Sequence, residues 1–139
     1  MSSLRMSFES PTAEEFVSLR LLAGMTVRDV QGVEVGLANS NHVVIFRDGE
    51  LLVGMGRVIG DGATTFQIAD IAVDPNYQGQ GLGKAIMAEL VKWLEENATP
   101  DSYVSLIADG DAKFLYEKFG FKATAPHSIG MHRYVNKQG

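Results

Sequence analysis

The chain has 139 residues, 45% of them hydrophobic, so we expect a single domain over residues 1–139 and no room for a second core. It carries 12 Lys and Arg against 17 Asp and Glu, and this net charge of -5 argues against a nucleic-acid partner, which would need a basic surface. The lack of cysteine in the sequence excludes disulfides, thiolate zinc sites and thiol nucleophiles.

No segment of the sequence suggests secretion or a membrane. Residues 1–10 contain no apolar stretch typical of a signal peptide, and no apolar run approaches the ~20 residues that span a bilayer. We therefore expect no membrane partner and a cytoplasmic protein.

Two helices are predicted near the N-terminus. Thr12 followed by Glu15 is a capping-box pattern, and the apolar residues behind it recur at helical spacing, which predicts a helix from Ala13 to Leu22. Asp29 is suited to cap a second helix that continues to Leu37. Two glycines lower the intrinsic stability of this second helix.

Three β-rich runs follow, separated by turn signals. Asp48-Gly49 and Asp61-Gly62 are dipeptides that favour tight hairpin turns. We therefore predict three antiparallel strands in a meander, over His42–Arg47, Glu50–Ile59 and Thr64–Val73.

The hydrophobic period changes after Pro75. A helical apolar stripe predicts the longest helix of the chain, and its members are Leu82, Ile86, Leu90, Trp93 and Leu94. A helix between strands requires a parallel pairing across it, so the sheet should be mixed.

The C-terminal part predicts two further strands and a short helix. Tyr103–Ala108 is typical of a buried strand, Asp111 is suited to cap a helix that ends at Phe119, and Gly120 fits the left-handed position after it. A last strand is expected over Met131–Val135.

A glycine-rich turn, Gln78–Gly83, joins the third predicted strand to the long helix. Its backbone N–H groups and the helix N-terminus could hold a pyrophosphate, although a tight connection without a ligand would look the same. A Walker A loop does not fit, because Ala85 follows Lys84 where Ser or Thr is needed. A Rossmann fingerprint fits poorly, since the glycines run G-x-G-x-G.

The turn resembles the acyl-CoA signature of the GNAT superfamily, Q/R-x-x-G-x-G/A, through Gln78, Gly81 and Gly83. A second segment, Ala112–Phe121, is similar to the family's A-x-x-L-Y-E-K-x-G-F. The resemblance implies an α/β (α+β) fold with a mixed, mainly antiparallel twisted sheet of about six to seven strands and about four helices.

The resemblance also implies acetyl-CoA as the cosubstrate and no metal. Backbone amides from Gly79 to Lys84 would hold the pyrophosphate, and the pantetheine arm would pair with Ile71–Val73, where the neighbouring strands splay apart. The implied CoA-binding residues are Ile71, Ala72, Val73, Gln78, Gly79, Gln80, Gly81, Leu82, Gly83, Lys84 and Asp109. Asp109 stands where the family often has Asn, and an ionised carboxylate only accepts hydrogen bonds.

By the same resemblance, Tyr116 is the predicted general acid, because a phenol can protonate the leaving thiolate. Without that resemblance it would be a packing residue of a short helix. Asp70 is the predicted base, and a surface or structural carboxylate is the equally weighted alternative. Met25, Arg28 and His127 lie in the segments that contact the acceptor in this family; Met25 could instead fill the core, and His127 could be merely exposed or a second base.

We therefore predict an N-acetyltransferase that acts on a primary amine. A small molecule is favoured over a protein because no extension beyond the core is expected to read a peptide, and assembly into a homodimer is left open. The alternatives are a peptide or protein N-acetyltransferase and a catalytically silent acyl-CoA sensor.

Overall fold

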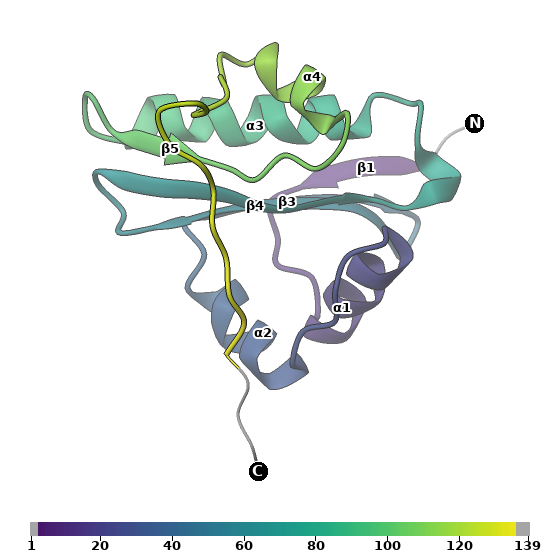
Figure 1. Ribbon diagram of the computed structural model, residues 1–139. Coiled ribbons are helices and arrows are strands. Elements are labelled where there is room, and N and C mark those ends of the chain that lie inside the picture. Colours follow the sequence, from purple (N-terminus) through teal and green to yellow (C-terminus); the bar gives the residue numbers. More distant parts are fainter. Residues whose placement is uncertain (1–2, 136–139) are drawn as a thin grey trace. The chain divides into compact units, whose positions relative to one another are not determined.

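The computed structural model describes residues 3–135 (Figure 1). The chain divides into two compact units, Met1–Leu106 and Ile107–Gly139. The expectation of a single domain stays a prediction.

The first unit is built on one sheet with the strand order β1-β2-β3-β4-β5. The first four strands pair antiparallel, and β5 pairs parallel with β4. This arrangement confirms the mixed, mainly antiparallel sheet, with five strands in the described residues instead of six or seven. The strands are β1 Leu4–Ser7, β2 His42–Asp48, β3 Leu51–Gly60, β4 Thr65–Val73 and β5 Tyr103–Ser105.

Helices cover both faces of this sheet, with α1 and α2 on one face and α3 on the other (Figure 1). Their bounds are α1 Ala13–Leu22, α2 Val30–Ala38 and α3 Leu82–Asn97, and a 3-10 turn, Pro75–Tyr77, precedes α3. The predicted capping box is confirmed, because Glu15 N donates to Thr12 Oγ1 at 3.2 Å and Thr12 N donates to Glu15 Oε2 at 2.7 Å. Asp29 caps α2 by accepting from Gly32 N at 2.8 Å.

The apolar stripe of α3 packs closely on β3 and β4. Ile86 and Leu90 are fully buried. A Cβ added to Gly56 of β3 would lie only 2.5 Å from Ile71 Cδ1 and 2.7 Å from Ile86 Cγ2. Glycine at this position therefore lets the helix approach the sheet.

Three predictions about strands and their turns were wrong. The β2–β3 turn has Gly49-Glu50 at its centre, one residue later than expected, with Gly49 at φ +60°. The β5 strand ends at Ser105 because its pairing with β4 ends there. The segment Met131–Val135 is exposed and is not a strand in the structure.

The strand β1 was not predicted. Its four residues, LRMS, alternate between apolar and polar, but the run is very short, and it lies at the edge of the sheet where none of it is fully buried. Pairing with β2, from Leu4↔Asp48 to Ser7↔Ile45, defines this strand, and a partner so far away along the chain cannot be identified from four residues.

The second unit contains α4, Ala112–Glu117. Asp111 precedes α4 as predicted, but its side chain makes no capping hydrogen bond, and the helix ends before Phe119. Gly120 has φ +89°, which confirms the left-handed position predicted for it.

No helix among residues 3–135 combines the length and apolar character that crossing a bilayer would require.

Candidate active site

A bulge in β4 places Asp70. Met55 pairs with Ala72 and Arg57 pairs with Ala69, so Asp70 and Ile71 together face a single residue of β3. Asp70 adopts φ +59°, an uncommon conformation for a residue with a side chain. The bulge therefore determines the face of the sheet on which the Asp70 side chain lies.

Asp70 lies between two arginines of neighbouring elements. Arg20 of α1 donates through Nη1 to Asp70 Oδ1, and Arg57 of β3 donates through Nε to Asp70 Oδ2 at 2.6 Å. The side chains of Arg20, Arg57 and Asp70 are 3%, 20% and 10% exposed. Each carboxylate oxygen keeps a second lone pair, so Asp70 can still accept a hydrogen bond from an amine or a water.

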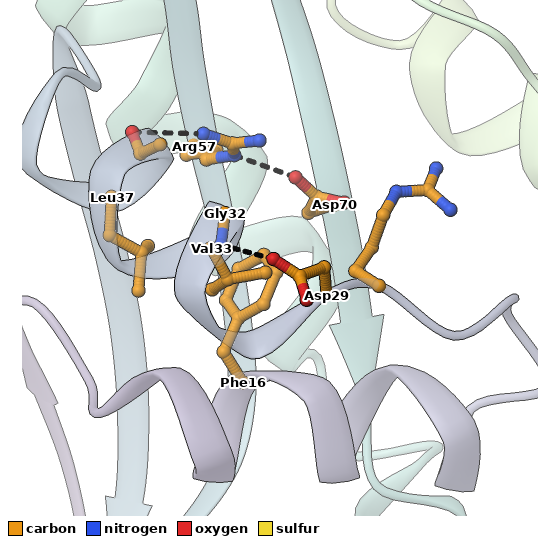
Figure 2. Close-up of a pocket in the computed structure, with 9 residues that line it drawn as sticks. Phe16, Asp29, Gly32, Val33, Leu37, Arg57 and Asp70 are labelled. Atoms are coloured by element: carbon orange, nitrogen blue, oxygen red, sulfur yellow. Dashed lines mark hydrogen bonds and ion pairs between the residues drawn. The ribbon is translucent and has the colours of Figure 1, made fainter. Parts of the chain in front are cut away.

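This carboxylate opens into a pocket of about 210 Å³ between α2 and the sheet (Figure 2). Charged side chains and apolar ones share its wall: Arg28, Asp29, Arg57 and Asp70 with Phe16, Val33 and Leu37. Figure 2 shows Asp70 facing Arg57 beside the α2 backbone. Charge beside apolar surface suits a small polar ligand.

One edge of β4 is open next to the bulge. The β4–β5 pairing ends at Gln67↔Ser105, whereas β4 continues to Val73. Among the described residues, no strand pairs with Ile71–Val73 on this edge. An extended ligand can therefore add to it as a strand would.

The glycine-rich turn follows β4 and leads into α3. Gly79 and Gly81 have φ +79° and +80°, and a Cβ at either position would meet no atom within 4 Å, so the backbone is open to an approaching group. Gly81 is the N-cap of α3 and supplies no side-chain cap, which leaves the first helical N–H groups for an anion. Tyr77 ties the turn to β2, because its hydroxyl donates to Asp48 Oδ2 at 2.5 Å.

Three predicted site residues belong to the second unit. Tyr116 of α4 is 8% exposed, and burial together with the nearby Asp109 carboxylate raises the pKa of its phenol, so the hydroxyl keeps its proton at neutral pH. His127 lies in an exposed loop. The roles of all three residues stay predictions.

The two remaining predicted residues lie in the first unit. Arg28 lines the pocket together with Asp70, whereas Met25 packs against the core cluster. The predicted residues that the structure brings together are thus Asp70 and Arg28.

Sequence reasoning missed Arg20 and Arg57, and both left a signal. Arg20 comes four residues after Phe16, on the apolar stripe of a helix, and Arg57 is the one charge in the ten-residue strand β3. A charge at a core position is rarely buried without a partner. Each of these two positions therefore indicates an ion pair, but only the tertiary structure identifies Asp70 as the partner.

A family profile described as an acetyltransferase (GNAT) domain matches residues 38–123, which include most of the sheet, the glycine-rich turn and α4. The chain belongs to the GNAT family. This match confirms the predicted GNAT acetyltransferase domain.

Relatives of this GNAT chain agree with the assignment. A crystallised Staphylococcus aureus protein of unknown function, described as a probable acetyltransferase, is 45% identical with a TM-score of 0.91, over 95% of this chain and 99% of that chain. A histone acetyltransferase of Glycine max is 39% identical over 61% of this chain and 36% of its own length. A chloroplastic GCN5-related N-acetyltransferase of Arabidopsis thaliana is 41% identical over 60% of this chain and 31% of its own length.

The GNAT chain thus spans about a third of the length of these two plant relatives. Within residues 3–135, no group of three or more His, Asp or Glu side chains is arranged to hold a metal ion.

Proposed function

We propose that this GNAT enzyme transfers the acetyl group of acetyl-CoA directly to the primary amine of a small molecule. The observation that carries the proposal is the open β4 edge followed by the uncapped, glycine-rich N-terminus of α3. The edge suits an extended pantetheine arm, and the helix end suits a pyrophosphate.

The residues of the turn fit this cosubstrate. Gly79 and Gly81 keep side chains away from the backbone N–H groups, and the exposed Lys84 adds a positive charge in the first turn of the helix. The thioester supplies an activated acetyl group when acetyl-CoA is bound. Backbone N–H groups near Ile71 or Val73 would then stabilise negative charge on the carbonyl oxygen as the amine attacks.

The side chains have separate proposed roles. Asp70 would accept a hydrogen bond from the incoming amine and assist removal of its proton, and Tyr116 would return a proton to the leaving thiolate. The nitrogen–carbon bond of the amide would form and the carbon–sulfur bond of the thioester would break, without a covalent enzyme intermediate.

The pocket beside Asp70 supports a small acceptor. Its volume of about 210 Å³ is below the range of about 300–1,000 Å³ that drug-sized ligands occupy. A peptide or protein acceptor is the second candidate, because the Glycine max relative is named a histone acetyltransferase. The cytoplasmic location is likewise our proposal.

A thiol-release assay with acetyl-CoA tests the function. The panel comprises polyamines, amino acids, arylalkylamines, aminoglycosides and peptides, and calorimetry measures acetyl-CoA affinity in parallel. Amine-dependent thiol release with a stoichiometric acetylated product is expected. Tight acetyl-CoA binding without turnover of any amine would favour the silent sensor, and turnover of peptides alone would favour the protein acetyltransferase.

A further inference from the structure

The cluster around Asp70 holds more positive than negative charge. One carboxylate is paired with two guanidiniums, and Arg20 is almost completely buried. A second acid of the pocket, Asp29, uses its carboxylate to cap the N-terminus of α2. The helix end that Asp29 caps is itself a site of partial positive charge.

A third guanidinium lies in the same pocket. Arg28 lines the same pocket, and its Nη1 donates to Thr26 Oγ1 at 2.7 Å. Burial lowers the pKa of Arg20, Asp70 opposes that effect, and the charges of Arg28 and Arg57 lower the pKa further. The three arginines are therefore close enough to repel one another, and the acids that line the pocket are Asp70 and Asp29.

Arg57 also keeps a donor for a ligand. Its Nε binds Asp70, and its Nη1 donates to Gly36 O at 3.2 Å and to Ser40 Oγ at 3.1 Å. Within residues 3–135, Nη2 has no hydrogen-bond partner. The guanidinium carbon lies 5.8 Å from the centre of the Phe16 ring, and these contacts fix the plane of the group before any ligand arrives.

We propose that the acceptor is a small amine that also carries an anionic group, a carboxylate or a phosphate. This inference rests on the proposed function and names its substrate class. Arg57 Nη2 and the Arg28 side chain bind the anion, while Asp70 accepts from the amine of the same molecule. The pocket has the volume of about seven waters, which is enough for a molecule of amino-acid size.

Equilibrium binding tests the proposal independently of turnover. Calorimetry at saturating CoA compares β-alanine with propylamine and O-phosphoethanolamine with ethanolamine, so that each pair differs by its anionic group. We expect the anionic member of at least one pair to bind about ten- to a hundredfold more tightly, the usual range for a charged hydrogen bond. The two pairs distinguish a carboxylate from a phosphate. Equal affinity within both pairs, tighter binding of the neutral analogues or no binding overturns the proposal.

Variants then locate the anion site. Arg57→Gln should abolish the preference for the anionic member, and Arg57→Lys, which keeps the charge but not the fork of donors, should retain part of it. Arg47→Gln is the matched control, because Arg47 of β2 also pairs with a carboxylate, Glu15, at 2.7 Å but lies outside the pocket. A full preference in Arg57→Gln overturns the assignment. If that variant does not fold, the Arg57→Lys result decides.

The thiol-release assay separates this inference from the proposed function. Anionic amines that bind through Arg57 without releasing thiol would disprove the acetyl transfer and leave the anion site in place. Neutral and anionic amines acetylated with equal kcat/KM would disprove the anion site and leave the transfer in place.

Discussion

Tyr116 has a buried ring, and its phenol has a raised pKa, caused first by burial and then by the Asp109 carboxylate. Tyr116→Phe retains the packing and removes the hydroxyl, so acetyl-CoA should still bind while kcat falls. General acid catalysis contributes about 10² to 10⁴ in rate, and we expect the lower end or less because a thiolate leaves readily. Single-turnover transfer at saturating substrates measures the loss. A variant as fast as the parent at every pH would give the hydroxyl a structural role only.

Asp70 neutralises two guanidiniums, so its loss should affect stability as well as chemistry. Asp70→Asn leaves Arg20 and Arg57 without their carboxylate. We expect the free energy of unfolding in urea to fall by about 3 kcal/mol, because the buried charge of Arg20 is then uncompensated. Asp101→Asn is the matched control, because Asp101 is exposed and has nearly the same backbone conformation, φ +62° against +59°. Equal stability of the two variants would contradict the buried-pair interpretation.

The same variant tests the proposed role of Asp70 as the base. Asn cannot take a proton, so the acidic limb of the kcat/KM profile should move or flatten. An unaltered limb with unaltered amine kinetics would assign the proton to His127 or to water, and Asp70 would then serve only to hold the arginines.

The glycine-rich turn before α3 could be predicted from the sequence, whereas the pocket beside Asp70 could not. Gln78–Lys84 is one contiguous segment whose glycines and following helix are visible in the sequence. The pocket combines Arg20, Arg57 and Asp70 from three elements, and the bulge sets the direction of Asp70. Strand alternation assumes a regular ladder, so it could not assign this side chain to a face.

The turn that begins α3 is the element for which the structure gives the sharpest test of CoA binding. Gly81→Val places a β-branched side chain at φ +80°, where it strains the backbone and covers the N–H groups of the helix end. The dissociation constant for acetyl-CoA, measured by calorimetry, should rise at least about tenfold, the equivalent of one charge-assisted hydrogen bond.

The control for this variant is Gly62→Val in the β3–β4 hairpin, which imposes the same substitution at a similar φ, +84°. It should lower stability without weakening acetyl-CoA binding. Parent-like affinity in folded Gly81→Val would place the pyrophosphate elsewhere.

Secondary structure could be predicted where each element has its own local signal. Helices α1 and α2 have caps, α3 has an apolar stripe, and β2, β3 and β4 are β-rich runs bounded by turns. The short strand β1 is defined by its pairing with β2, whereas Met131–Val135 has strand-like composition but is not a strand in the structure. A strand forms through hydrogen bonds and packing with a neighbouring strand, so a short segment is difficult to predict as a strand from its own residues alone.

For the whole molecule, the order of elements and the pairing across α3 follow from the sequence, because a parallel β4–β5 pair requires a long crossover. An aromatic group joins β2 to α3 in this arrangement. The His42 ring stacks on Trp93 with a centroid separation of 5.7 Å, and Trp93 contacts Phe66 edge-on at 6.0 Å. This group couples the stability of the fold to pH.

Burial lowers the pKa of His42 below its ordinary value of 6.5, against a smaller opposing effect of Glu89. The unfolded chain therefore binds a proton at His42 more readily than the folded chain does. The stabilisation from neutral His42 is fully present above about pH 6.5 and is lost as the pH falls through that value towards the folded pKa. His42→Phe keeps an aromatic ring against Trp93 and removes the titration. Urea unfolding from pH 8 to pH 5 should show a shallower fall in the free energy of unfolding for this variant than for the parent. Parallel curves would show that His42 does not contribute to the pH dependence.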